Sequence, residues 1–367
     1  MKKSGFLIFM SIALLPALAQ KNDYRLLIGT YTSTGVSQGI YAYHADLKSG
    51  VFTQKSVTTG ISNPSFLAIP ADKKFVYAVS ESSDKSTVNA YTFNQEHAKL
   101  ILLNSVSTRG AGPCFVSVSD LHVVTANYTG GSISVFGRNT DGSVTEVLQV
   151  IQHAGSSINP TRQNVPHVHQ VIFTPDGKYL LVNDLGTDKV TVYLYNKKSK
   201  NNVLTPFDSL TMKPGSGPRH LTFGKNGKHI YLLQEIDGTV SVLEMKKGKL
   251  RLIQETTLVK KSGIQTGAAD IHLSRDGKFL YATNRGTAND ISCFAVKKDG
   301  TLSFVSQVST GGNGPRNFAI TPDGNYLFVA HQKSDNIVIF KRDKKTGILS
   351  DTGKKIEVGA PVCLLFY

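Results

Sequence analysis

The stretch Gly217–Phe223 (GPRHLTF), followed by the turn Asn226–Gly227 and the apolar run His229–Leu233 (HIYLL), returns in variant form along the whole chain. Aligning Arg219 with its counterparts gives seven anchors separated by 49, 55, 50, 50, 47 and 46 residues, namely Ser65, Cys114, His169, Arg219, Ala269, Arg316 and Val362. A repeat of about fifty residues built from short strands is typical of the blades of a β-propeller.

The composition agrees with an all-β chain made of repeats. The 367 residues include 33 Gly and 13 Pro, and Val, Ile, Tyr and Phe alternate with polar residues instead of forming a helical apolar face. Tight turns are marked by glycine, often after Asp or Asn, which supplies the positive φ that such turns need. The turns predicted in this way are Asp176-Gly177, Asn226-Gly227, Asp276-Gly277, Asp323-Gly324, Asp141-Gly142, Gly248, Asp299-Gly300 and Gly347. We expect one domain with almost no helix.

The two ends of the chain are predicted to share one blade. Strand-like runs begin at Tyr24 and Gly39, but no innermost strand precedes them. The run Val362–Phe366 carries the last anchor and leaves no room for the rest of a blade. Six complete blades and this composite make a seven-bladed β-propeller, in which the C-terminal strand completes the blade begun by the N-terminus and removes the sheet edges of an open ring.

Residues 1–19 have the features of a secretory signal peptide. Lys2 and Lys3 precede the apolar run Phe6–Leu18, and small residues predict cleavage after Ala19. The alternative is a retained membrane anchor, although the apolar run is short for a membrane-spanning helix. We expect residues 20–367 to form the propeller domain, exported to the periplasm or the extracellular space and free of the membrane after cleavage.

The net charge of +15 raises the question of nucleic acid binding. The lysines, however, form short doublets such as Lys197-Lys198 and Lys297-Lys298 beside predicted hairpin turns, which favours a solvated surface. We expect a monomer that does not bind nucleic acid. Cys114, Cys293 and Cys363 are too few and too scattered for a disulfide framework or a metal cluster, so we expect them to be small buried residues.

The direction of the strands predicts which face of the propeller carries the functional site. Neighbouring strands in a blade are antiparallel, so both sets of tight turns lie on one face. The starts of the inner strands and the loops after the second strands lie on the other face, where loops can carry chemistry. The polar residues at these positions are His167, His169, Arg219, His220, Asp270, Arg316, Asn317, Glu81, Asn127, Tyr128, Asn183, Asp184, Glu235, Asn284, Arg285 and His331.

His167 and His169 are two residues apart, so on a strand their side chains share a face. They are candidates for a binding or catalytic role, although a structural role is the alternative. A metal pair is also conceivable, but the further ligands would have to come from distant parts of the chain.

Arg219 and Arg316 follow Gly-Pro in two repeats, and His169 occupies the same position in a third. Such cations would repel one another unless a carboxylate or an anionic ligand lies between them. Glu235 is the obvious protein carboxylate. Either the arginines bind an anion and Glu235 handles a proton or a water molecule, or the same residues form structural ion pairs between and within blades.

No phosphate-binding loop, no Gly-x-Ser-x-Gly motif and no nucleophilic Ser or Cys in a recognisable context is present in the sequence. The simplest reaction for histidine, glutamate and arginine on one rim is therefore hydrolysis or closure of an activated ester with an acidic group, without a cofactor.

At these residues the chain resembles a known family. The motifs Gly217-Pro218-Arg219-His220, Ala268–His272, Tyr281–Arg285 and Gly314–Phe318 are similar to those of the seven-bladed propeller lactonases, which include 6-phosphogluconolactonases and fungal 3-carboxy-cis,cis-muconate cyclases. The resemblance extends over residues 24–367 and is more specific than a generic propeller repeat.

The resemblance implies lactone chemistry at the mouth of the central channel. The catalytic set proposed for the cyclases falls on His169, Arg219, Glu235 and Arg285. Around it we predict a substrate-binding set of His167, His220, Asp270, Asn284, Arg316, Asn317, His331 and Asn127. The expected partner is a small-molecule lactone with an acidic group, and the expected reaction is hydrolysis of 6-phospho-D-glucono-1,5-lactone.

Two alternatives stay open at this stage. An exported propeller could act on another lactone, with or without a metal, because the phosphorylated lactone is a cytoplasmic intermediate in this family. It could also bind a glycan or protein without catalysis, which would predict exposed aromatic side chains on the rim. The chain has no Trp, and only Tyr31 and Tyr128 are aromatic candidates there.

Overall fold

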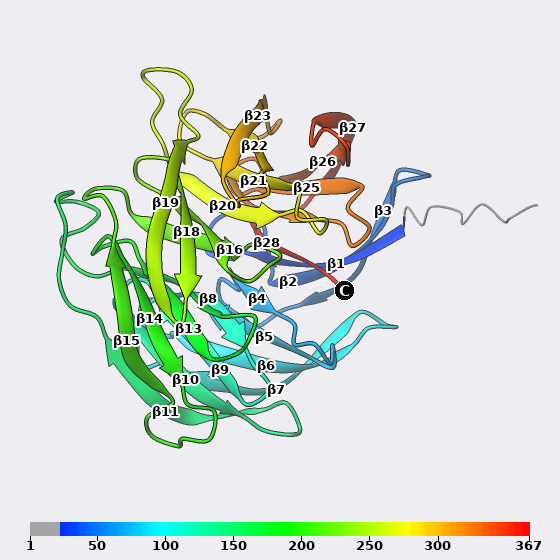
Figure 1. Ribbon diagram of the computed structural model, residues 1–367. Coiled ribbons are helices and arrows are strands. Elements are labelled where there is room, and N and C mark those ends of the chain that lie inside the picture. Colours follow the sequence, from blue (N-terminus) through cyan, green and yellow to red (C-terminus); the bar gives the residue numbers. More distant parts are fainter. Residues whose placement is uncertain (1–22) are drawn as a thin grey trace, which may run out of the picture.

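The computed structural model describes residues 23–367, and these residues form 28 strands and no helix. The strands make seven antiparallel sheets of four strands each, arranged in a ring (Figure 1). The predicted seven-bladed all-β propeller is thus confirmed. The predicted signal peptide lies outside the described residues. Residues 23–367 contain no helix long and apolar enough to span a bilayer.

The composite blade joins the two ends of the chain, as predicted. Its strand order is β28-β1-β2-β3, and in Figure 1 the red C-terminal strand lies beside the blue N-terminal ones. Strand β28 pairs antiparallel with β1, with Leu26 opposite Phe366 and Ile28 opposite Leu364. The four strands are β1 (Asp23–Thr30), β2 (Ile40–Asp46), β3 (Val51–Thr58) and β28 (Pro361–Phe366).

Each of the other six blades consists of four consecutive strands, numbered from the centre of the ring outward. The second and third blades contain β4 (Leu67–Ala68), β5 (Phe75–Ser80), β6 (Thr87–Asn94), β7 (Lys99–Ser107), β8 (Pro113–Val118), β9 (His122–Asn127), β10 (Ser132–Arg138) and β11 (Val144–Gln152). The fourth and fifth contain β12 (Val168–Phe173), β13 (Tyr179–Asp184), β14 (Lys189–Tyr195), β15 (Leu204–Thr211), β16 (Pro218–Phe223), β17 (His229–Gln234), β18 (Thr239–Lys246) and β19 (Lys249–Thr257). The sixth and seventh contain β20 (Ala268–Leu273), β21 (Phe279–Asn284), β22 (Asp290–Val296), β23 (Leu302–Ser309), β24 (Pro315–Ile320), β25 (Tyr326–His331), β26 (Asn336–Arg342) and β27 (Leu349–Glu357).

The tight turns form where the glycines predicted them. In the turn between β24 and β25, Gly324 has φ of +72°, a left-handed conformation that favours glycine. The preceding Asp323 accepts hydrogen bonds from Thr321 Oγ1 at 2.6 Å and from the backbone NH of Asn325 at 3.1 Å. Its other oxygen accepts a hydrogen bond from Tyr24 at 2.7 Å, so this turn also ties the last blade to the composite blade.

Apolar side chains fill the spaces between blades. One cluster joins Leu26 and Ile28 of the composite blade to Phe328 and Ala330 of the seventh blade, and all four are fully buried. Similar clusters lie elsewhere around the ring, so the core of the described residues consists of seven packed groups. The three cysteines are free and buried within it, as expected from the sequence.

A tyrosine in the second strand of a blade repeatedly locks the next blade in place. The hydroxyl of Tyr77 donates to the carbonyl of Gly142 at 2.8 Å, that of Tyr231 to Gly300 at 3.1 Å, and that of Tyr281 to Gly347 at 2.7 Å. Each acceptor is a glycine of the turn between the third and outer strands. Hydrogen bonds on the predicted turn face therefore also hold neighbouring blades together.

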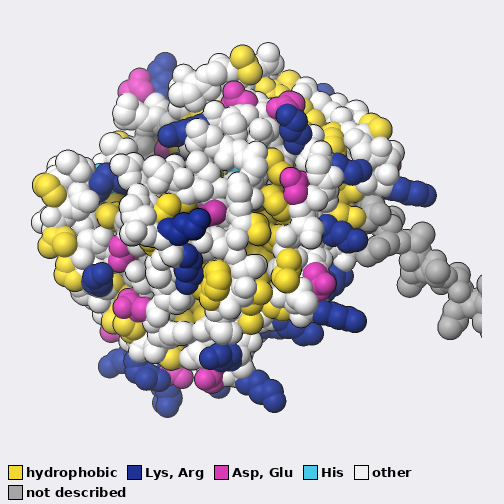
Figure 2. Space-filling view, turned by 90° about the horizontal axis from the view of Figure 1, so that it is seen from above, with side chains coloured by type: hydrophobic (Ala, Val, Ile, Leu, Met, Phe, Trp, Pro, Cys, Tyr) yellow, Lys and Arg dark blue, Asp and Glu magenta, His cyan; other side chains and the backbone are white. Residues whose placement is uncertain are grey.

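Basic side chains are dispersed on the face of the molecule that Figure 2 shows. Figure 2 shows Lys and Arg side chains scattered over the visible face, many at its edge, with Asp and Glu among them. This distribution fits the solvated surface that the lysine doublets predicted.

Candidate active site

A cavity of about 340 Å³ opens on the face opposite the tight turns. We call it the inner chamber, and the residues that line it are Tyr31, Glu81, Cys114, Tyr128, Arg162, His169, Glu235, Arg285 and Arg316. All except Arg162 lie at the start of an inner strand or directly after a second strand. These eight residues therefore lie on the face that the argument from strand direction indicated.

Glu235 lies at the centre of the charged groups in the inner chamber. It directly follows β17, and its backbone NH donates to the carbonyl of Gly217 at 2.7 Å, which fixes the residue at the end of the strand. Three arginines contact its carboxylate: Arg219 Nε at 2.8 Å, Arg285 Nη2 at 3.0 Å and Arg162 Nη2 at 2.6 Å. The carboxylate predicted to separate the arginines is thus present at that place.

The same contacts decide the charge of Glu235. Burial alone would raise the pKa of its carboxyl group, but the positive charges of Arg285, Arg219 and Arg162 outweigh burial and hold the pKa far below its usual range. Glu235 is therefore ionised at every physiological pH. A carboxylate held in this way is a weak proton acceptor, and its main effect is to keep the three guanidinium groups together.

His169, on β12, faces the same carboxylate. Its Nε2 lies 3.9 Å from Glu235 Oε2, and the residue is only 5% exposed. Burial lowers the pKa of the imidazole well below its ordinary value of 6.5, and the charges of Arg219, His220 and Arg316 lower it further. His169 is therefore neutral at neutral pH and has a free ring nitrogen lone pair, although the lowered pKa makes it a weaker base than an exposed histidine.

Arg219 lies behind Glu235 and does not line the inner chamber. It is 2% exposed, its Nε is committed to Glu235, and its Nη1 donates to the carbonyl of Ala269 in the next blade. For Arg219, this position favours the structural ion pair, one of the two alternatives that the sequence left open, over direct binding of an anion. It supports Glu235 and lowers the pKa of His169 through its charge.

Arg285 and Arg316 do face the inner chamber. Arg285 Nε donates to the carbonyl of Gly267 at 2.7 Å, which orients the guanidinium toward Glu235. Arg316 Nη2 donates to the hydroxyl of Tyr31 at 2.8 Å, and that hydroxyl in turn donates to Glu81 Oε2 at 2.9 Å. Tyr31 thus separates Arg316 from Glu81, and the guanidinium has no direct ion pair with a carboxylate among residues 23–367.

Arg162 is the residue that the repeat pattern missed. It lies in the segment between β11 and β12, and its Nη2 contacts both Glu235 and, at 3.2 Å, the hydroxyl of Tyr128. The segment is fixed by the fully buried Gln163, whose Nε2 donates to the carbonyl of Leu185 at 2.9 Å. The signal in the sequence was the spacing of 55 residues between Cys114 and His169, the longest of the six intervals.

His167 lies beside the inner chamber rather than in its lining. Its ring stacks on Tyr128 with centroids 4.5 Å apart, and its Nδ1 is 3.0 Å from the backbone carbonyl of Tyr128. The histidine therefore supports the tyrosine that contacts Arg162. Among the described residues no group of three or more His, Cys, Asp or Glu side chains is arranged to hold a metal ion.

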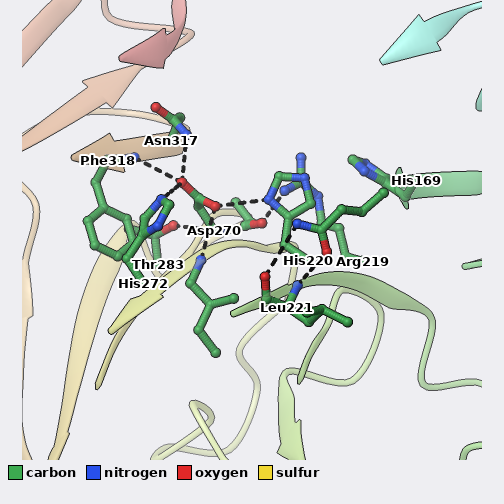
Figure 3. Close-up of polar contacts among 12 residues, drawn as sticks. His169, Arg219, His220, Leu221, Asp270, His272, Thr283, Asn317 and Phe318 are labelled. Carbon is green, nitrogen blue, oxygen red and sulfur yellow. Dashed lines mark hydrogen bonds and ion pairs between the residues drawn. The ribbon is translucent and has the colours of Figure 1, made fainter. Parts of the chain in front are cut away.

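Asp270 is the hub of a buried network beneath the chamber (Figure 3). It accepts hydrogen bonds from His220 Nδ1 at 2.9 Å, His272 Nε2 at 2.8 Å and Asn317 Nδ2 at 2.6 Å. These residues belong to β16, β20 and β24, and Asn317 Oδ1 also accepts from the backbone NH of Leu364 in β28 at 2.7 Å. The network therefore joins four consecutive inner strands.

The predicted substrate-binding residues His220, Asp270 and Asn317 belong to this network and do not line the inner chamber. His220 touches the site indirectly, because its ring centroid lies 5.1 Å from that of His169. Burial lowers the pKa of His220 to about 4, and the charge of Arg219 adds to that effect.

Asn127, Asn284 and His331 are fully buried at the ends of second strands, outside the lining of the inner chamber. Asn127 Nδ2 donates to Ser132 Oγ at 3.0 Å, and Asn284 Oδ1 accepts from the backbone NH of Gly267 at 3.1 Å. Burial lowers the pKa of His331 to about 4. The first two residues thus hold loop geometry, and Asn284 does so beside Arg285.

Comparison with known proteins agrees with this geometry. Residues 25–366 match the family described as Lactonase, 7-bladed beta-propeller. The chain belongs to this lactonase family.

The relatives of this lactonase are similar over their whole length. It is 34% identical to the 6-phosphogluconolactonase of Bacillus subtilis (strain 168), with 92% of this chain and 97% of the relative covered. Among solved structures, a candidate 6-phosphogluconolactonase from Bacteroides fragilis is 43% identical with a TM-score of 0.90, covering 95% and 99% of the two chains. The periplasmic gluconolactonase of Pseudomonas aeruginosa is 36% identical with a TM-score of 0.89, covering 94% and 99%. The protein is an enzyme that hydrolyses lactones.

Proposed function

We propose that this lactonase hydrolyses 6-phospho-D-glucono-1,5-lactone to 6-phospho-D-gluconate, using water and its own side chains. The observation that carries the proposal is the pairing of a neutral, buried histidine with an excess of arginine in one chamber. Arg162, Arg285 and Arg316 line the chamber against two carboxylates, Glu81 and Glu235. An excess of positive charge favours an acidic substrate and the oxyanion formed during its hydrolysis.

The chemistry follows from these positions. His169 accepts a proton from a water molecule as the water attacks the carbonyl carbon of the lactone. Arg285 and Arg316 face the negative charge that develops on the carbonyl oxygen. The bond between the carbonyl carbon and the ring oxygen then breaks, and the ring oxygen leaves as a hydroxyl group that takes its proton from His169. Glu235 keeps Arg285 in place throughout.

The test compares turnover of freshly prepared 6-phosphogluconolactone and glucono-1,5-lactone by residues 20–367 and by the Glu235→Gln variant. We expect the variant to lose about 10²-fold or more in kcat/KM, because the arginines lose the carboxylate that holds them. Glu244→Gln is the matched control, since Glu244 forms a single ion pair within residues 23–367, with the exposed Arg251 at 2.8 Å, away from both the inner strands and the chamber. Turnover no faster than the spontaneous reaction on both lactones would refute the proposal.

Chelator is included in parallel reactions. Turnover that is unaffected by chelator would agree with a reaction run by the side chains alone, whereas inactivation that added divalent metal reverses would refute that part of the proposal.

Export is a separate part of the proposal. Its support is the sequence of residues 1–19 and the similarity to a relative that is named periplasmic. Expression of the full chain followed by cell fractionation and N-terminal sequencing tests it. A mature protein outside the cytoplasm that begins at Gln20 is the expected result, and a cytoplasmic protein that keeps Met1 would contradict it.

A further inference from the structure

A second hollow, of about 210 Å³, adjoins the inner chamber. We call it the outer chamber. It shares Arg162, Glu235 and Arg285 with the inner chamber, and its other lining residues are Gly267, Gly286, Asn313, Gly314, Gln332 and Lys333. The two hollows therefore meet at the Glu235 carboxylate and the two arginines that contact it.

The side chains that line the outer chamber carry a net positive charge. Arg162, Arg285 and Lys333 line it against the single carboxylate of Glu235, which leaves an excess of two positive charges. The three cations come from three separate parts of the chain: the segment before β12, the loop after β21 and the loop after β25. Their convergence on one hollow is a property of the fold and not of a lysine-rich stretch.

The polar groups of this hollow are also available for a ligand. The backbone NH of Asn313 donates to Ser334 Oγ at 2.9 Å and that of Gln332 to the carbonyl of Gly314 at 3.0 Å, so the loops are fixed by their backbones. The side-chain amides of both residues and the ammonium group of Lys333 have no hydrogen-bond partner among residues 23–367.

The shared arginines also keep donors free. Arg162 uses Nη2 for Glu235 and Tyr128, and Arg285 uses Nε for Gly267 and Nη2 for Glu235. Each guanidinium thus retains an Nη1 group without a partner in the described part of the chain. Planar guanidinium groups with free donors suit the oxygens of a phosphate.

We propose that the outer chamber is the subsite for an anionic tail of the substrate, and that the tail is a phosphate monoester. This inference rests on the proposed hydrolysis of 6-phosphogluconolactone, which places the reacting carbonyl in the inner chamber beside His169 and Arg316. The phosphate of 6-phosphogluconolactone is attached through C6 to the ring carbon that carries the ring oxygen. A lactone that places its carbonyl beside His169 and its C6 toward Glu235 would bring its phosphate to the outer chamber.

The first experiment measures kcat/KM for 6-phosphogluconolactone and for glucono-1,5-lactone in the wild type and in Lys333→Met. We expect the ratio of the two values to fall about tenfold in the variant, the effect of losing one charge-assisted hydrogen bond. Lys298→Met is the matched control, because Lys298 is exposed in the turn between β22 and β23 on the opposite face. An unchanged ratio in Lys333→Met would overturn the inference.

The second experiment does not depend on turnover. Calorimetry measures binding of inorganic phosphate and of acetate to the wild type, to Lys333→Met and to Lys298→Met. Phosphate binding that is weakened about tenfold only in Lys333→Met supports the subsite, even if neither lactone is hydrolysed. Absence of phosphate binding to the wild type, equal binding by Lys333→Met, or equal affinity for acetate would each overturn it.

Discussion

Arg162 Nη2 lies 2.6 Å from Glu235 Oε1, although the two residues are 73 positions apart in the sequence. The contact brings the segment between β11 and β12 to the place where the inner and outer chambers meet. The same guanidinium contacts Tyr128 and lines both chambers, so Arg162 connects Tyr128, the inner chamber and the outer chamber.

Replacing Arg162 with Met should lower kcat/KM for 6-phosphogluconolactone by about 10- to 100-fold, the range expected for losing a hydrogen bond between charged groups. The main effect should be on KM, since Arg162 faces the ligand from both chambers. Steady-state kinetics with subtraction of the spontaneous rate measures it. Arg109→Met is the control, because Arg109 has a 64% exposed side chain and lies 4.0 Å from Glu146. Equal kinetics in the two variants would show that Arg162 has no part in binding.

The repeat predicted much of this site, and Arg162 shows where it could not. A regular spacing places every residue that occupies the same position in a blade, so His169, Glu235, Arg285 and Arg316 could all be assigned to one face. Arg162 has no counterpart in other blades. Its side chain reaches Glu235 only because Gln163 ties an irregular segment to the next blade, and no periodic pattern encodes that contact.

The pH dependence of the reaction should report the environment of His169. Burial and neighbouring positive charges lower the pKa of this histidine below 6.5. A group with a lowered pKa keeps its neutral, proton-accepting form to lower pH, so activity should fall only when the pH drops below that value. A profile of kcat/KM from about pH 4.5 to 7.5 tests this, since kcat/KM reports groups of the free enzyme.

The same pH profile measured in Arg316→Met tests whether neighbouring positive charge lowers the pKa of His169. Removing one of the charges that lower the pKa of His169 should move the acid limb to higher pH, whatever the variant does to the height of the profile. An acid limb at or above 6.5 in the wild type, or no movement in the variant, would contradict the assignment of His169 as the proton acceptor.

Asp270 shows a second limit of prediction from the sequence. The repeat predicts its strand but not the direction in which its side chain points. The sequence placed it at an inner strand on the predicted functional face. The residue is only 2% exposed, and its carboxylate joins inner strands instead of lining the inner chamber. A polar residue at the start of an inner strand can face either the cavity or the neighbouring strand. The pairing of β20 with β21 shifts register between Ala268 and Ile271, and Asp270 lies in that irregular part of the strand.

Replacing Asp270 with Ala should lower the free energy of unfolding by about 3–5 kcal/mol, the cost of leaving buried partners of a charged group unpaired. Burial alone would raise the pKa of Asp270, but the charge of His272 and the hydrogen bonds from His220 and His272 hold it well below 3.8, so the carboxylate is ionised at neutral pH. Chemical denaturation at pH 7 measures the loss, with the exposed Asp120→Ala as control. Equal stability of the two variants would mean that the hub does not stabilise the ring.

The tyrosine locks give a prediction for the opposite face of the molecule. Tyr281 is fully buried, and its hydroxyl donates to Gly347 at 2.7 Å while accepting from Arg342 Nε at 2.9 Å. Tyr281→Phe removes both hydrogen bonds without creating a large cavity. It should therefore cost about 1–3 kcal/mol of unfolding free energy and leave kcat/KM unchanged, since no chamber residue contacts this hydroxyl.

A double-mutant cycle with Arg342→Met separates the lock from the loss of packing. Because Arg342 donates to the hydroxyl that Tyr281→Phe removes, the two changes should be non-additive by about 0.5 kcal/mol or more. Tyr179→Phe serves as the matched control, since its ring is only partly buried and packs on Phe207 with centroids 5.3 Å apart. Additive effects, or a loss of stability as large in Tyr179→Phe, would show that blade-to-blade hydrogen bonding by this tyrosine contributes nothing beyond its packing.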